Sequence, residues 1–81
     1  MTTLGKLYRY IPDGSTRLVF SGLEFTAKVL CRLKTNDIIL LLKKQTMAVH
    51  DELSYDHYYA VCPDGSVGWI NFEEDEWEIV S

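Results

Sequence analysis

The sequence predicts an all-β fold, a small barrel of five to six short antiparallel strands. Short segments rich in β-branched and aromatic residues recur at close spacing, and clusters of Pro, Gly, Asn and Asp separate them. No segment of helix length repeats its apolar residues with the helical period. A barrel is favoured because closure hides strand edges that so small a chain could not otherwise cover.

The chain has 81 residues, enough for one domain spanning residues 1–81. Its longest apolar run, residues 38–42, is far shorter than the roughly 20 residues of a membrane-spanning helix. The N-terminus shows no basic segment followed by an apolar one, which is the pattern of a secretory leader. We therefore expect a cytoplasmic protein that does not associate with membranes.

Turn chemistry bounds the expected strands. The tetrapeptide P-D-G-S occurs at residues 12–15 and again at 63–66, where Pro sets φ for a turn and Gly accepts a positive φ. Asn36 is the expected left-handed residue of another turn. Strands are expected at residues 7–11, 29–33, 38–42, 58–62, 67–72 and 77–80, with an irregular hairpin at 18–26 and a short 3₁₀ segment around 73–76.

Aliphatic residues of the alternating segments are expected to fill the interior. Within residues 29–33 every second side chain points the same way, so Val29 and Leu33 share a face. Residues 45–56 are mostly polar and indicate either a long loop or a distorted hairpin tip. The predicted core residues are Val29, Leu33, Ile39, Leu41, Val61 and Ile70.

Charge is divided unevenly along this chain, whose net charge is −4. Residues 1–44 hold all eight basic residues and three acids, a net +5, whereas residues 45–81 hold nine acids and no Lys or Arg. Either the two halves attract each other within the fold, or an acidic patch steers a basic partner. An acidic protein of this kind is not expected to bind nucleic acid. The patch comprises Glu73, Glu74, Asp75 and Glu76.

The candidate groups for metal binding and catalysis are few. Cys31 and Cys62 form no C-x-x-C pair and lie in apolar, alternating segments, so we expect reduced thiols in or near the core. Two imidazoles and three carboxylates occur at residues 50–57, but their spacing matches no compact ligand motif. Nucleotide-binding and nucleophile-turn motifs are absent from the sequence. No metal, cofactor or catalytic residue is predicted, and the protein is not expected to be an enzyme.

Three segments, taken in order, resemble SH3 domains. Residues 7–10, L-Y-R-Y, resemble the opening A-L-Y-D-Y strand of that family, and residues 33–39, L-K-T-N-D-I-I, resemble its F-K-K-G-D-I-I diverging turn. Residues 58–61, Y-Y-A-V, followed by a tight turn and by G-W-I at residues 68–70, resemble its W-W-x-A, distal hairpin and G-W-I/F-P. The resemblance implies an SH3-like barrel.

The sequence departs from this family at positions where its members contact Pro-rich ligands. The stretch between Tyr8 and Asp37 is longer than a typical RT loop and lacks its acidic cluster, and Asn71 replaces the proline after G-W-I. The pattern is closer to the SH3-like domains of bacterial and phage proteins than to a eukaryotic receptor of PxxP peptides. We therefore expect PxxP peptides to bind weakly or not at all.

Aromatic residues from three separate segments would converge on one surface of an SH3-like barrel. Rigid rings with a polar rim suit a peptide groove, but a small barrel also needs bulky side chains in its core, so both locations stay open. The residues expected to bind a peptide or protein are Tyr8, Tyr10, Tyr58, Trp69, Asn71 and Phe72.

The sequence thus predicts a non-catalytic protein-interaction module that binds a protein or peptide through an aromatic surface groove. The alternative is a small phage structural or host-inhibitory protein in the host cytoplasm. Such a protein would dock by its whole barrel surface and its acidic C-terminal segment. Weak self-association stays open in both cases.

Overall fold

The fold is almost entirely β, as predicted. The computed structural model describes the backbone of residues 2–50 and 53–80 and the side chains of residues 2–46 and 56–80. Within these described residues the strands number seven rather than five or six, and one 3₁₀ helix, η1, lies where the sequence places it. The elements are β1 (Leu7–Tyr10), β2 (Arg17–Phe20), β3 (Val29–Leu33), β4 (Ile38–His50), β5 (Leu53–Val61), β6 (Val67–Asn71), η1 (Glu74–Glu76) and β7 (Trp77–Ile79).

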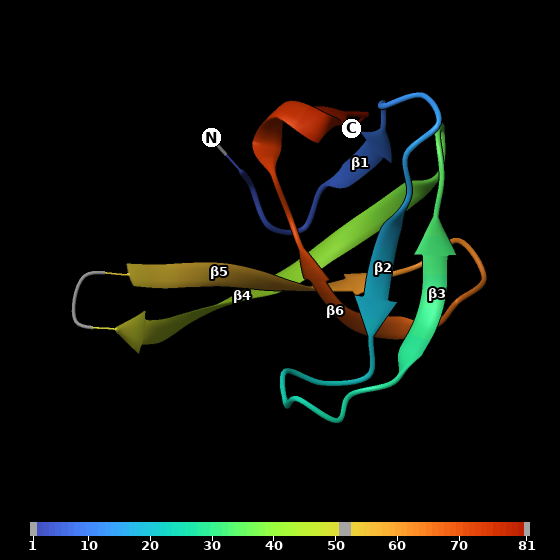
Figure 1. The fold of residues 1–81 in the computed structure, drawn as a ribbon. Coiled ribbons are helices and arrows are strands. Elements are labelled where there is room, and N and C mark those ends of the chain that lie inside the picture. Colours follow the sequence, from blue (N-terminus) through green and yellow to red (C-terminus); the bar gives the residue numbers. More distant parts are fainter. Residues whose placement is uncertain (1, 51–52, 81) are drawn as a thin grey trace.

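One antiparallel sheet contains all seven strands, in the order β3-β2-β6-β5-β4-β1-β7. The sheet curls into a half-barrel, which brings β1 and η1 over one end of the interior (Figure 1). The irregular hairpin expected within residues 18–26 does not form, because β2 pairs with β3 instead. Among the described residues, no helix has the length and apolar character to cross a membrane.

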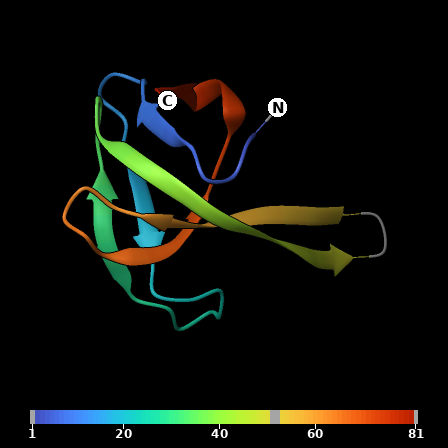
Figure 2. The ribbon, with the colours of Figure 1, turned by 180° about the vertical axis from the view of Figure 1, so that it is seen from behind.

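The β4–β5 hairpin extends away from the rest of the half-barrel as a long arm (Figures 1 and 2). Its pairing runs from Leu40 with Val61 out to His50 with Leu53 and shifts register twice. Such bulges add local twist to a hairpin. Residues 45–56 therefore belong to paired strands, apart from residues 51–52, which lie outside the described part of the chain.

The predicted turn residues have the backbone conformations that their types favour. Asn36 has φ of 75°, Gly14 has φ of 71° and Gly65 has φ of 91°. The two P-D-G-S turns nevertheless make different connections between strands. The first carries the chain from β1 to β2, which are not neighbours, whereas the second closes the β5–β6 hairpin, where the Cys62 N–H donates to the Ser66 carbonyl oxygen at 2.7 Å.

The aliphatic core is largely as predicted. Leu33, Ile39, Leu41 and Ile70 are each at most 1% exposed. The prediction for Val29 is wrong. This residue is the first of edge strand β3, and its side chain is 50% exposed.

Val61 is half-buried instead of buried. In β5 the inward positions are Tyr58 and Ala60, followed by Cys62 just beyond the strand, so strict alternation turns Val61 to the other face. Both faces of this strand carry apolar residues, which is why the sequence pattern alone does not reveal which face is buried.

Aromatic side chains fill the end of the interior beneath β1 and η1. Each of the five is at most 7% exposed, and their rings contact one another with centroid separations between 5.0 and 5.3 Å. They are Tyr8, Tyr10, Tyr58, Phe72 and Trp77. All of them except Tyr10 line the site described next.

Candidate functional site

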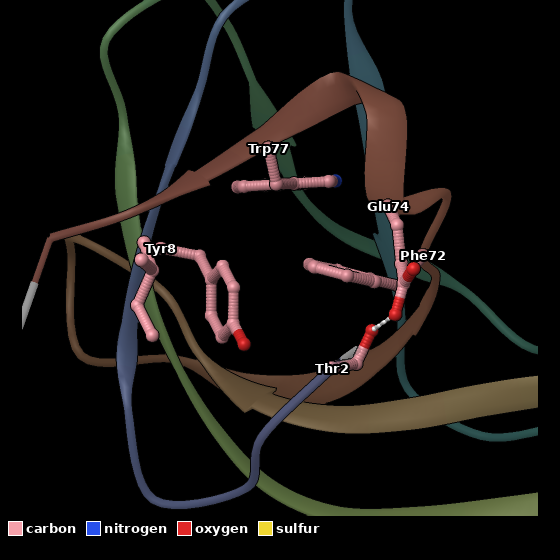
Figure 3. Close-up of a pocket in the computed structure, with 6 residues that line it drawn as sticks. Thr2, Tyr8, Phe72, Glu74 and Trp77 are labelled. Carbon is pink, nitrogen blue, oxygen red and sulfur yellow. Dashed lines mark hydrogen bonds between the residues drawn. The ribbon is translucent and has the colours of Figure 1, made fainter.

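A pocket of about 250 Å³ opens beside the aromatic cluster, where the N-terminal segment, β1, η1 and β7 meet (Figure 3). Figure 3 shows three aromatic rings, those of Tyr8, Phe72 and Trp77, pointing into a common space, with Thr2 and Glu74 closing one side. We call this site the aromatic pocket. Its lining residues are Thr2, Tyr8, Phe72, Glu74, Trp77 and Ile79.

Strand alternation and one turn of 3₁₀ helix place these side chains together. Phe72 follows β6 and continues the inward positions of that strand. η1 then reverses the chain, with the Glu76 N–H donating to the Glu73 carbonyl oxygen at 3.0 Å. The chain returns as β7 beside β1, which sets Ile79 opposite Tyr8 in the ladder.

The rings of the pocket present both faces and edges. Phe72 and Trp77 lie nearly parallel, with centroids 5.3 Å apart and an interplanar angle of 18°. Tyr8 meets Phe72 edge-on, at 5.2 Å and 76°. Edge-to-face and offset-stacked pairs are the favourable arrangements for aromatic side chains, so the walls are held by their own contacts.

The polar groups at the pocket are held unequally. The Thr3 N–H donates to the Tyr8 hydroxyl oxygen at 2.8 Å, and the Thr2 hydroxyl donates to Glu74 Oε1 at 2.5 Å. In contrast, the buried indole Nε1 of Trp77 has no hydrogen-bond partner within the described part of the chain. A buried N–H without a partner costs free energy, so an acceptor brought by a ligand would be favourable there.

A second hollow, of about 510 Å³, adjoins the aromatic pocket. The two share Thr2, Phe72 and Glu74. The hydrogen bond from Thr2 lowers the pKa of Glu74, so this carboxylate is ionised at neutral pH. We call the second site the acidic hollow. Its lining residues are Thr2, Asp56, Tyr58, Phe72, Glu73, Glu74 and Asp75.

The expected acidic patch divides into two groups. The Glu76 carboxylate forms an ion pair with Arg17, and both side chains are about three-quarters buried. Glu73 and Asp75 are exposed, and no ion pair from the described residues reaches their side chains. One acid of the patch therefore balances positive charge within the fold, while these two present negative charge to solvent.

Three residues of the predicted aromatic groove line these hollows. Tyr8, Tyr58 and Phe72 lie in one or both of them. Their exposed fractions of 6–7% show that they form a wall that is continuous with the core. Tyr10, at 1% exposure, is a core residue, so of the two locations left open by the sequence it occupies the interior and not a surface groove.

Trp69 and Asn71 are separated from this site. Both occupy the β6 face opposite to Ile70, so the six predicted residues do not form one groove. Trp69 instead packs against Tyr59 with centroids 5.0 Å apart. The Lys43 Nζ lies 4.9 Å from the Tyr59 centroid and 5.5 Å from the Trp69 centroid, which is a cation–π geometry.

Three residues of the aromatic pocket are not among those predicted from the sequence. Trp77 was assigned only to the closing strand, although a buried tryptophan with a polar N–H is typical of sites with one apolar and one polar side. Thr2 and Ile79 carry no recognisable signal in the sequence. Only the fold brings the N-terminal segment beside η1.

A search of protein-family models found none that matches this sequence, and searches of curated proteins and of solved structures gave no significant match. The resemblance to SH3 domains therefore stays a prediction that rests on the three sequence segments.

Proposed function

We propose that this protein is a non-catalytic interaction module that binds a basic segment of a protein partner. The segment would lie across the acidic hollow and insert one side chain into the aromatic pocket. The observation that carries the proposal is that the two sites adjoin each other and share Thr2, Phe72 and Glu74.

Lysine and arginine are the side chains that suit both sites at once. Their aliphatic stems pack against aromatic rings, and their cationic heads are attracted to ring faces. The carboxylates of Glu73, Glu74 and Asp75 lie beside those rings. Hydrogen bonds between ionised groups are about twice as strong as neutral ones. A basic side chain would therefore gain from both walls, whereas an acidic one would meet repulsion.

The size of the aromatic pocket also favours recognition of a side chain. Its volume of about 250 Å³ lies just below the usual range for small-molecule sites, about 300–1,000 Å³. The lining offers three aromatic side chains, the hydroxyls of Thr2 and Tyr8, and the carboxylate of Glu74. These groups can orient and hold a peptide side chain.

We also propose that the half-barrel is an SH3-like fold. The arrangement of η1 between the last two strands, beside the first strand, supports that resemblance. The ligand we propose differs from a PxxP peptide because the acids lie on and around η1 and not in the long β2–β3 connection. We also propose a cytoplasmic location, where reducing conditions would keep both thiols free.

Selection from displayed random peptides, followed by titration of the chosen peptides, tests this function. We expect enrichment of Lys or Arg. Glu74→Gln should weaken binding at least about tenfold, as for loss of a hydrogen bond to a charged group. Trp77→Phe should also weaken binding, because tryptophan is the aromatic side chain that attracts a cation most strongly. The matched controls are Trp69→Phe and Asn71→Ala on the opposite face, which should leave affinity unchanged. Selected peptides without basic residues, or equal losses in pocket and control variants, would contradict the proposal.

A second candidate is docking by a broad surface, and the side chain of Phe25 favours it. This residue lies in the β2–β3 connection and is fully exposed, whereas most large apolar side chains are at least partly covered. A phage structural or host-inhibitory protein could use such an anchor. Phe25→Ser would then abolish association with the partner, while the same change would leave binding of a basic peptide intact.

A further inference from the structure

Two cysteines and one aspartate meet on the side of the half-barrel away from the aromatic pocket. Cys31 lies in β3, Cys62 directly follows β5, and Asp64 lies in the β5–β6 turn. One ligand atom from each, two sulfurs and a carboxylate oxygen, all lie within 4.8 Å of one another. The three come from two segments that are distant in the sequence, which is why no compact ligand motif announces them.

The fold itself brings these groups together. β2 pairs with β3 on one side and with β6 on the other, so β3 lies near the end of the β5–β6 hairpin. The second P-D-G-S turn then directs Asp64 toward the thiols. The Ser66 N–H donates to Asp64 Oδ1 at 2.9 Å, which holds the carboxylate in place within the turn.

This set of donors selects the class of cation. Thiolates prefer borderline-soft or soft ions, whereas Mg²⁺ and Ca²⁺ require six or more oxygen ligands. Zn²⁺ lies about 2.3 Å from sulfur and about 2.0–2.2 Å from carboxylate oxygen, so ligand atoms around it are separated by about 3.5–3.8 Å. Ligand atoms already within 4.8 Å need to close by only about 1 Å.

The site can be reached from solvent because its three side chains differ in exposure. Cys62 is buried, Cys31 is half-buried and Asp64 is exposed. A cation would therefore enter from the side of Asp64, and a tetrahedral ion with three protein ligands keeps one position for water or a fourth ligand.

We propose that Cys31, Cys62 and Asp64 form a binding site for a thiophilic divalent cation of the Zn²⁺ class. The ion would connect edge strand β3 to the β5–β6 turn and would stabilise the folded state, because it binds the folded chain far better than the unfolded one. This site is independent of the aromatic pocket and of the function proposed for it.

Titration of the reduced 81-residue chain with Co²⁺, in the absence of oxygen, tests the site. We expect one equivalent to bind with thiolate-to-cobalt charge-transfer absorption, and we expect Zn²⁺ to displace it and to raise the Tm. The absorption is specific to thiolate ligands, so Co²⁺ bound elsewhere, for example by the imidazoles of residues 50–57, does not produce it. Absence of this absorption at millimolar Co²⁺ would overturn the proposal.

The repeated tetrapeptide supplies a matched control. Asp64→Asn should weaken Co²⁺ binding more than about tenfold, because loss of a ligand costs at least as much as loss of an outer partner. Asp13→Asn, in the other P-D-G-S turn, should leave binding unchanged. Cys31→Ser, which alters the less buried thiol, should abolish the charge-transfer band. Equal Co²⁺ binding by all three variants would contradict the assignment. The assignment would also be contradicted if oxidised glutathione formed a Cys31–Cys62 disulfide as readily with Zn²⁺ present as without it, because a bound ion would protect the thiols.

Discussion

Trp77 stacks on Phe72 with ring centroids 5.3 Å apart and an interplanar angle of 18°. The two residues lie on either side of η1, so the contact closes the 3₁₀ turn back onto the core. The same pair lines the aromatic pocket, which means that one contact serves both the fold and the site. Variants that address function must therefore be matched with variants that report stability alone.

Neighbouring leucines of β4 provide a test of the core. Leu41 is fully buried, whereas Leu42 is 42% exposed on the other face of the strand. We expect Leu41→Ala to lower the free energy of unfolding by about 2–5 kcal/mol, the usual cost of such a cavity. Leu42→Ala should cost less than about 1 kcal/mol. Urea denaturation of both variants measures the difference, and equal midpoints would contradict the assigned faces of β4.

Two ion pairs that differ in burial test the part of the acidic patch that acts within the fold. Arg17–Glu76 is about three-quarters buried, whereas Arg9–Glu78 is more than 40% exposed at both side chains. Breaking a buried pair leaves an uncompensated charge, but exposed pairs contribute only about 0–1 kcal/mol. Glu76→Gln should therefore destabilise the protein more than Glu78→Gln does. A larger loss for Glu78→Gln in thermal melts at low salt would refute this division.

The exposed acids should act on the rate of association. We expect Glu73→Gln combined with Asp75→Asn to slow association of a basic peptide and to flatten its salt dependence, with little change in dissociation. The reason is that rim charges steer the encounter, and salt screens them over about 8 Å at physiological ionic strength.

Stopped-flow measurements at several salt concentrations give both rate constants for that double variant. Its thermal stability should match that of the unaltered protein, because no ion pair from the described residues reaches either side chain. A lowered Tm with an unchanged association rate would show that these acids balance charge within the fold instead.

The buried thiol of Cys62 predicts a loss of stability in alkaline solution. Burial, and then the hydrogen bond with Cys31, raise the pKa of Cys62 from the ordinary 9.0 to about 12. A raised pKa in the folded state contributes stability that is fully present below pH 9.0 and is lost as the pH rises toward 12.

Comparison with Cys62→Ala isolates this contribution, because other groups also titrate in that range. With a chelator present, the difference in unfolding free energy between the parent protein and the variant should shrink from pH 9 to pH 12. Parallel stability curves across that range would show that the thiol does not titrate as described.

The fold follows from the sequence because local signals agree with the final structure. Asn36 and the glycines of both P-D-G-S turns need positive φ, and the chain turns at each of them. The length of the β4–β5 arm was not evident, because polar residues in 45–56 carry little apolar alternation. Backbone hydrogen bonding, which any residue can supply, extends those strands.

The site was harder to predict than the fold. The sequence does not show which face of a strand is buried, nor which residues far apart in the chain come together. Alternation gives the period of β6 but not which face is covered, so Trp69 and Asn71 were grouped with Phe72 although they lie on the opposite face. Thr2 joins the pocket only because η1 folds back toward the N-terminal segment, where the Thr2 hydroxyl meets Glu74. Contacts between such distant residues leave no trace in local sequence patterns.

The indole N–H resonance of Trp77 gives the most direct test of the proposed binding site. The chain has two tryptophans, so a ¹⁵N-labelled sample shows two indole signals, and Trp69→Phe assigns them. On titration with a selected basic peptide, we expect the Trp77 signal to shift in proportion to the bound fraction while the Trp69 signal stays in place. A shift of the Trp69 signal with no movement of the Trp77 signal would place the ligand on the opposite face of β6 and contradict binding at the aromatic pocket.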